Sequence, residues 1–163
     1  MRNIVLIGMP GSGKSTVGVL LAKALGMKFA DLDLDIMERT GRKLQEILDQ
    51  DGLRAFLQEE EDTVLASQYT NTIIATGGSV VLEPAAMAYL RENGVFVFLD
   101  VPLLELQHRI TNIKTRGIAC EKDQTLEDVY RERIGLYREY ADITIGIEKD
   151  IEATVQEVIN RLK

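Results

Sequence analysis

A lysine and a serine directly follow a glycine-rich segment near the start of the chain. Residues 8–15, GMPGSGKS, match the pattern G-x-x-x-x-G-K-[ST]. Glycines let the backbone curl so that several N–H groups point at one phosphate, and the positive end of a following helix favours the same anion. Lys14 can reach the outer phosphates of a nucleotide, and the Ser15 hydroxyl can bind Mg²⁺. The segment therefore predicts a phosphate-binding loop (P-loop) for a nucleoside triphosphate.

Three aspartates alternate along the chain after the second apolar run. Asp31, Asp33 and Asp35 are spaced at i, i+2 and i+4, so on an extended segment they share one face. Neighbouring carboxylates repel one another unless a cation or a donor lies between them, and Mg²⁺ or a substrate hydroxyl suits that position. We assign Asp31 and Asp33 to the site, and Asp35 to the N-cap of the next helix.

A second glycine cluster, Gly77-Gly78, directly follows the third apolar run. In an open α/β sheet, ligands bind at the carboxyl ends of the strands. Glycines placed there can let a substrate approach backbone N–H groups, although two glycines can also form a plain turn. We interpret the pair as part of the substrate site.

The elements that must position these residues follow a β-α repeat. Short apolar runs predict strands at residues 3–7, 28–32, 72–75, 95–99 and 143–147. Segments of helical period, with their caps, predict helices at residues 14–25, 35–40, 43–50, 53–68, 84–92, 103–111, 125–140 and 151–162. Strands that are apolar on both faces indicate a five-stranded parallel sheet between two layers of helices, a three-layer α/β/α fold. Residues 112–124 show no period and predict a mobile loop.

Length and composition limit the remaining possibilities. The 163 residues predict a single domain over 1–163, with 45% apolar and 28% charged residues. A net charge of −7 argues against a protein that mainly binds nucleic acid. One cysteine cannot form an internal disulfide, and no apolar run approaches the roughly 18 residues of a membrane span. We expect a cytoplasmic protein, a monomer that binds neither membranes nor nucleic acid.

Other P-loop proteins fit the sequence less well. A GTPase needs a guanine-reading [NT]-K-x-D pattern after a later strand, and the chain has none. Asp100, at the end of the fourth predicted strand, imitates the metal-facing acid of a mechanical ATPase, but we interpret it as a surface acid. His108 and Cys120 are interpreted as residues outside the chemistry.

At this point the sequence resembles the shikimate kinase family of P-loop kinases over essentially its whole length. The matching residues are GMPGSGKST at 8–16, Asp31 and Asp33, ERTG at 38–41, Asp51-Gly52 with Phe56 and Glu60, TGG at 76–78, Arg109, Arg116, and the R-x-x-L-Y-x-x-x-A-D pattern at 133–142. The resemblance implies a P-loop kinase fold, and an enzyme that transfers the γ-phosphoryl group of ATP to a hydroxyl of shikimate with the help of Mg²⁺, in aromatic amino acid biosynthesis.

The resemblance also implies a role for each matching residue. The nucleotide would be bound by Gly11, Ser12, Gly13, Lys14, Ser15, Thr16, Arg109 against the adenine, and Arg116. Ser15 would bind Mg²⁺ directly and Asp31 through water. Asp33 would orient or deprotonate the attacking hydroxyl, Gly77 and Gly78 would contact the substrate, and Arg133 would pair with its carboxylate. Lys14, Asp33 and Arg116 are the implied catalytic residues, with Arg116 carried by the loop at about 112–124 as a lid that excludes water.

Three departures from the family pattern concern the acceptor and the lid. The family carries F-R-x-x-E where this chain has Leu57 in the second position, so one arginine for the substrate carboxylate is missing. Arg54, one turn earlier, could replace it. Ser79 stands for the third glycine of G-G-G, and Gly117 follows Arg116 where the family has proline. Two alternatives to a shikimate kinase therefore stay open: a related kinase with another alcohol as acceptor, and a nucleotide-binding protein without catalysis.

Overall fold

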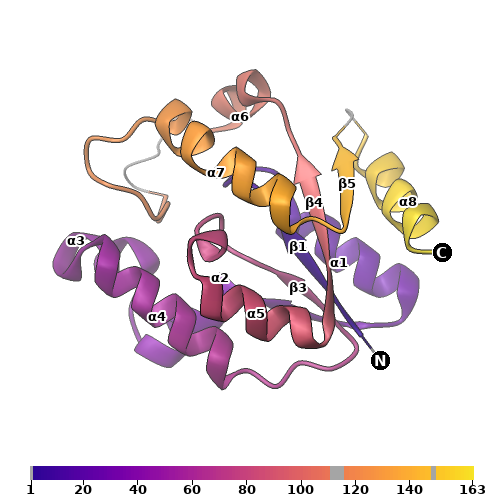
Figure 1. Ribbon diagram of the computed structural model, residues 1–163, viewed down its shortest axis with the longest axis horizontal. Coiled ribbons are helices and arrows are strands. Elements are labelled where there is room, and N and C mark those ends of the chain that lie inside the picture. The colour runs from indigo at the N-terminus through magenta and orange to yellow at the C-terminus, as the bar shows by residue number, and fades with distance from the viewer. Residues whose placement is uncertain (1, 111–115, 148–149) are drawn as a thin grey trace.

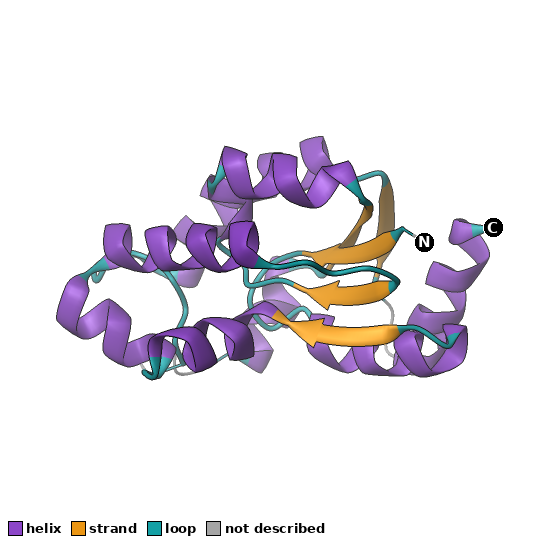
Figure 2. Cartoon of the chain, turned by 90° about the horizontal axis from the view of Figure 1, so that it is seen from below, coloured by secondary structure: helices purple, strands orange, loops and turns teal. Residues whose placement is uncertain are grey.

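Five parallel strands form a single sheet in the computed structural model, which describes residues 2–110, 116–147 and 150–163. The strand order is β2-β3-β1-β4-β5, and every neighbouring pair is parallel (Figures 1 and 2). The strands are β1 (Asn3–Ile7), β2 (Lys28–Asp31), β3 (Thr72–Ala75), β4 (Gly94–Asp100) and β5 (Ile143–Gly146). The predicted α/β fold with a five-stranded parallel sheet is confirmed.

Helices cover both faces of this sheet. They are α1 (Lys14–Leu25), α2 (Leu32–Thr40), α3 (Leu44–Asp51), α4 (Leu53–Ala66), α5 (Pro84–Glu92), α6 (Leu103–Arg109), α7 (Leu126–Tyr140) and α8 (Ile151–Leu162), with one short 3₁₀ turn, η1 (Val80–Leu82). None of these described helices has both the length and the apolar character that crossing a membrane requires.

The alternation of side chains along β1 divides the core into two layers. Val5 and Ile7 belong to the cluster that includes α5, η1 and α7, whereas Ile4 and Leu6 belong to the cluster that includes α1 and α8. Successive side chains of a strand point to opposite faces of a sheet. A central strand that is apolar at every position therefore requires a helical layer on each side.

A third apolar cluster lies at the carboxyl edge, where α2, α3 and α4 meet. Ile36, Ile47 and Phe56 are its most buried members, and Ala119, from the segment before α7, packs on them. Residues 116–124 contain no helix or strand, in agreement with the predicted loop at 112–124, whose first part, 112–115, lies outside the described residues.

Several predicted boundaries agree with the structure, and the clearest difference concerns α2. The helix begins at Leu32, three residues before the predicted start, because the Asp31 side chain accepts hydrogen bonds from the N–H groups of Asp33 and Leu34. The predictions that Asp35 is the N-cap and that the three aspartates share an extended face are therefore wrong. Asp33 and Asp35 lie in the first turn of a helix, and Asp35 accepts a hydrogen bond from the Tyr69 hydroxyl.

Helix α7 is fixed to the sheet by an aromatic contact. The Tyr137 ring stacks on Phe98 of β4, with 5.3 Å between the ring centroids and 23° between the planes. Both side chains are buried. At the N-terminus of α7, Thr125 and Asp128 form the predicted capping box. The aromatic pair sets the height of α7 above the sheet, and with it the position of Arg133 one turn earlier.

We predict that Phe98→Ala lowers the free energy of unfolding by about 3–5 kcal/mol, because it opens a cavity and removes the partner of Tyr137. Chemical denaturation followed by circular dichroism measures this loss. Leu104→Ala is the control, since Leu104 is 82% exposed and its truncation should change the free energy by no more than about 0.5 kcal/mol. Equal losses in the two variants would contradict the assignment of the core.

Candidate active site

The loop between β1 and α1 has the backbone of a phosphate cradle. Gly11 and Gly13 have φ angles of +81° and +92°, a region that side chains other than glycine rarely adopt. A Cβ atom at Gly11 would lie 2.7 Å from Ile110 Cδ1, so this position also lacks space for a side chain. Gly13 is the N-cap of α1, and a Cβ atom placed there would meet no atom beyond its chain neighbours within 4 Å among the described residues. The loop therefore leaves the positive N-terminal end of α1 accessible to an anion.

Lys14 is buried at the start of α1 and is held by its own loop. Its ammonium group donates hydrogen bonds to the carbonyl oxygens of Gly8 at 2.7 Å and Met9 at 2.9 Å. Burial lowers the pKa of Lys14 to about 8, although Asp33 and Asp31 favour the charged form. The lysine is therefore desolvated and close to two carboxylates, a state in which an arriving phosphate gains much from pairing with it.

Ser15 and Asp31 meet across the loop. The Ser15 hydroxyl donates to Asp31 Oδ2 at 2.8 Å, while Oδ1 of the same carboxylate caps α2. One aspartate thus links the P-loop to the start of α2, which brings a hydroxyl and a carboxylate together as oxygen donors.

Asp33, in the first turn of α2, lines the same cavity as Lys14 and Ser15. Burial and the neighbouring Asp31 raise its pKa to about 6, and Lys14 opposes this shift. Such a carboxyl is ionised at neutral pH and remains a competent proton acceptor.

Gly77 and Gly78 follow β3 and are shaped by close contacts. A Cβ atom at Gly77 would lie 2.9 Å from Asp33 Oδ1, and one at Gly78 would lie 2.6 Å from Pro10 Cδ. The Gly78 carbonyl accepts a hydrogen bond from the Tyr137 hydroxyl. The two glycines are therefore required by packing against α2 and the P-loop, and they leave the backbone exposed to the cavity.

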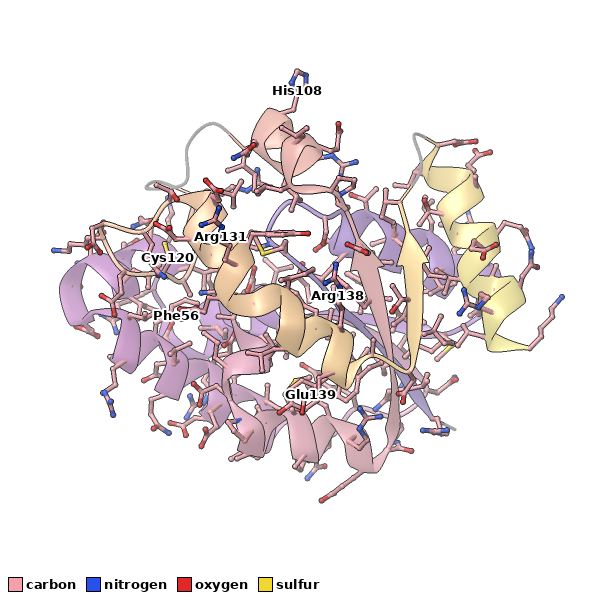
Figure 3. The ribbon with its side chains drawn as sticks, turned by 45° about the horizontal axis from the view of Figure 1, so that its top comes forward. Phe56, His108, Cys120, Arg131, Arg138 and Glu139 are labelled. Carbon is pink, nitrogen blue, oxygen red and sulfur yellow. The ribbon has the colours of Figure 1, made fainter. Side chains whose placement is uncertain are left out.

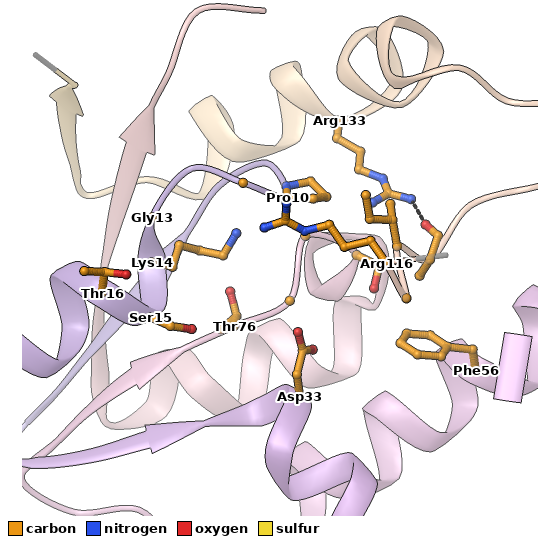
Figure 4. A pocket seen from close by; sticks show the side chains of 17 residues that line it. Pro10, Gly13, Lys14, Ser15, Thr16, Asp33, Phe56, Thr76, Arg116 and Arg133 are labelled. Carbon is orange, nitrogen blue, oxygen red and sulfur yellow. Dashed lines mark hydrogen bonds between the residues drawn. The ribbon is translucent and has the colours of Figure 1, made fainter. Parts of the chain in front are cut away.

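Arg133 enters the cavity from α7 and is only 1% exposed. Its Nη2 donates to the Ala119 carbonyl (Figure 4), and its Nε lies 3.3 Å from Glu132 Oε1. Its Nη1 has no hydrogen-bond partner among the described residues. A buried guanidinium N–H without a partner is costly, so this atom is suited to bind an anion that enters the cavity.

Arg116 also lines the cavity, and its side chain points toward the P-loop (Figure 4). The following Gly117 has φ of +79°, and its N–H donates to Gln45 Oε1 at 2.9 Å. Proline cannot adopt this φ and has no N–H to donate. The replacement of proline by glycine at 117 therefore gives this segment a different path from the one that the family pattern implies.

Together these groups line one cavity of about 220 Å³ at the carboxyl edge of the sheet. Among the described residues that line it, Lys14, Arg116 and Arg133 supply three positive charges, against one carboxylate, Asp33. The chain as a whole carries a net charge of −7. A cationic cavity in an acidic protein indicates an anionic ligand.

Two predicted nucleotide residues lie outside the cavity lining. Ser12 is buried, and its N–H donates to the Met9 carbonyl. Arg109 donates to the Gly11 carbonyl at 3.0 Å and pairs with Glu105, so it lies against the outside of the P-loop. Thr16 does line the cavity, together with the predicted Gly11, Gly13 and Ser15.

Phe56, Thr76 and Ser79 line the cavity as well. No role of their own was predicted for Phe56 and Thr76, whereas Ser79 is one of the departures expected to affect the acceptor. The Ser79 hydroxyl is directed to Glu60, a glutamate with no exposed surface. Arg54, the suggested replacement for the missing arginine, lines a separate cavity with Leu57 and Gln58. Among the described residues, the guanidinium groups that line the active-site cavity are therefore those of Arg116 and Arg133, without Arg54.

Three residues of chemical interest lie elsewhere. His108 projects from α6 away from the body of the protein (Figure 3), and Cys120 lies on the segment before α7. Asp100, at the end of β4, is absent from the cavity lining.

The sequence and the structure both resemble known proteins. A family model described as "Shikimate kinase" matches residues 10–163. The chain is 37% identical over 164 residues to "Shikimate kinase" from Aromatoleum aromaticum, covering 94% of each chain. It is 36% identical over 170 residues to "Threonine synthase-like 1" from Pongo abelii, covering 99% of this chain but only 22% of that protein. A solved structure, "Shikimate kinase from Acinetobacter baumannii in complex with shikimate", matches with a TM-score of 0.89 at 30% identity, covering 99% of this chain and 93% of the other.

We predict that the Glu60 carboxyl makes the protein less stable as the pH rises. Burial raises the pKa of Glu60 from 4.5 to about 8. Below pH 4.5 the carboxyl is protonated in both the folded and the unfolded protein. Between pH 4.5 and about 8 only the unfolded chain releases the proton, which favours unfolding. Above pH 8 both states have released it, and the loss in the free energy of unfolding stays constant. Relative to wild type, Glu60→Gln should therefore gain stability by about 1.4 kcal/mol per pH unit across that window. Urea unfolding from pH 5 to 8.5 measures the difference, and a difference independent of pH would contradict the assignment.

Proposed function

The chain belongs to the shikimate kinase family, and from this premise we propose that it transfers the γ-phosphoryl group of ATP to a hydroxyl group of shikimate. The observation that carries the proposal is the cavity itself. It joins a phosphate-binding loop to a buried arginine whose Nη1 has no partner in the part of the chain that the structure describes, with the Asp33 carboxylate between them.

The nucleotide end of the site is the P-loop and the start of α1. The ammonium group of Lys14 can exchange its two loop carbonyls for the outer phosphates, and the free N–H groups at the N-terminus of α1 bind the same anion. Arg109, which donates to the Gly11 carbonyl from outside the loop, is the residue that we assign to the adenine. The triphosphate thus lies with its end toward the middle of the cavity.

The oxygen donors near the loop suit Mg²⁺. The Ser15 hydroxyl and the Asp31 carboxylate lie 2.8 Å apart, and the described residues contain no group of three or more acidic, cysteine or histidine side chains that would form a metal cage. Mg²⁺ in kinases is bound by one or two protein oxygens, by phosphates and by water, so the pair fits. When bound, the ion neutralises charge on the phosphates.

The acceptor end is built from three distant segments. Nη1 of Arg133 can pair with the substrate carboxylate, and the backbone of Gly77 and Gly78 can contact the ring and its hydroxyls. This arrangement fixes the acceptor at two points and leaves one hydroxyl near Asp33.

The transfer then requires few chemical steps. Asp33 accepts the proton of the substrate hydroxyl, whose oxygen forms a bond to the γ-phosphorus as the bond to the β,γ-bridging oxygen breaks and ADP leaves. Lys14 and Arg116 stabilise the charge on the transferring group. Positioning and charge stabilisation supply the rate, and residues 116–119, which line the cavity, help to exclude water from it.

A second acceptor class is favoured by one observation. Leu57 stands at the position where the family has a second carboxylate-binding arginine, and Arg54 lines a separate cavity, so it does not replace that arginine. With Arg133 as the one buried arginine among the described residues, a related kinase for another small hydroxy acid or polyol fits the same fold.

We predict ATP consumption that depends on shikimate and Mg²⁺, measured as ADP release and as formation of a phosphate ester by phosphorus NMR. Arg133→Lys should raise the KM for shikimate about tenfold or more, because an ammonium group cannot reproduce the planar contact of a guanidinium. Arg131→Lys is the control, since Arg131 is exposed on the same helix. Turnover with another hydroxy acid and none with shikimate would favour the second acceptor class instead.

We also predict an acid limb in the pH profile. Because burial and Asp31 raise the pKa of Asp33 to about 6, kcat/KM should fall as the pH drops through 6 and the base becomes protonated. Asp33→Asn should lower kcat by about 10²–10⁴-fold and abolish this limb, while ATP still binds. An unchanged acid limb in the residual activity of Asp33→Asn would show that another group is titrating.

A further inference from the structure

Glu60 is a buried carboxyl at the acceptor end that the proposed reaction leaves without a role. It lies on the inner face of α4, with Phe56 one turn before it and Val64 one turn after it. It has no exposed surface. A carboxyl in such a place is stable only where hydrogen bonds hold it.

Ser79 supplies the hydrogen bond. Its Oγ lies 2.9 Å from Glu60 Oε1 and 3.1 Å from Oε2, and the serine is itself only 2% exposed. Among the described residues, this hydroxyl is the one side-chain group within hydrogen-bond distance of the Glu60 carboxyl. The contact joins α4 to the loop after β3, which lines the cavity.

The same carboxyl also faces the catalytic aspartate. A Cβ atom at Gly77 would lie 2.9 Å from Asp33 Oδ1 and 3.2 Å from Glu60 Oε2, so both carboxyls converge on the Cα of Gly77. The Glu60 carboxyl is therefore close to both the glycine loop and Asp33. Glu83 and Arg133 are the other charged groups that act on Glu60.

Leu57, three residues before Glu60 on α4, offers no donor. Residues at i and i+3 of a helix are neighbours on its surface, so a guanidinium at 57 could reach the Glu60 carboxyl. In this chain the position is apolar and the donor comes from Ser79 instead. The two departures from the family pattern, at 57 and at 79, therefore both concern the hydrogen bonding of the Glu60 carboxyl.

We propose that Ser79 is a positioning residue for the acceptor: by holding Glu60 it fixes the Gly77–Gly78 backbone and Asp33, the task that a donor at position 57 would otherwise perform. The proposal rests on the proposed function but holds for whichever hydroxyl acceptor the chain uses. The nucleotide end of the cavity depends less on the contact between Ser79 and Glu60, because Lys14 is held by the carbonyls of its own loop.

The test is a double-mutant cycle on the full chain, with Ser79→Ala, Leu57→Arg and the double variant. The acceptor is the one that wild type turns over best in a panel of shikimate, sugar acids, polyols and amino-acid alcohols. Ser79→Ala should lower kcat/KM for the acceptor about tenfold, because a buried carboxyl loses its donor, and should leave the KM for ATP within about twofold. Leu57→Arg should restore most of this loss in the Ser79→Ala background and change wild type little.

Ser67→Ala is the matched control, since it removes a hydroxyl that bonds to the Val64 carbonyl at the far end of α4. It should leave both KM values unchanged. Three results would overturn the proposal: an unchanged acceptor kcat/KM in Ser79→Ala, equal losses for acceptor and ATP together with a lower melting temperature, or the same gain from Leu57→Arg in both backgrounds. Turnover of an acceptor other than shikimate would refute only the shikimate assignment.

Discussion

The site depends on the burial of a positive charge next to negative ones at one edge of the sheet. Lys14 is removed from water at the start of α1, where its pKa falls to about 8, and the carbonyls of Gly8 and Met9 replace its hydration. Asp33 offsets part of the same cost from the opposite side. A phosphate that enters this arrangement meets a desolvated ammonium group, which can exchange two carbonyls of its own loop for phosphate oxygens, and this favours electrostatic stabilisation of phosphoryl transfer.

The conformation of the P-loop could be predicted from the sequence because it is local. The residues from β1 to the first turn of α1 are contiguous, and their glycines, lysine and serine carry the geometry by themselves. The strand β1, the helix α1 and the capped helix α7 have the predicted bounds for the same reason, since apolar runs and caps are short-range signals. The α2 boundary was wrong because two aspartates competed for one cap, and Asp31, which also binds Ser15, is the one that accepts the N–H groups.

The acceptor end could be predicted only in part, because it is assembled from segments far apart in the chain. The Ser79–Glu60 contact spans 19 positions and joins a loop to a helix, so no local pattern indicates it. The same holds for Arg133, because its position in the helical pattern is equally typical of a solvated residue. Its burial follows from the stacking of Tyr137 on Phe98. Family resemblance indicated this arginine, and tertiary packing explains how it reaches the cavity.

The two ends of the cavity therefore differ in how freely the sequence can change. At the P-loop a side chain at Gly11 is excluded by both φ and space, so variation there would remove the phosphate site. At the acceptor end, the donor to Glu60 is Ser79, a residue that departs from the family pattern, and Nη1 of Arg133 has no hydrogen-bond partner among the described residues and is suited to the anion contact. Since specificity is a difference between affinities for competing ligands, the choice of acceptor is set at this adaptable end, while the chemistry of transfer stays with the rigid one.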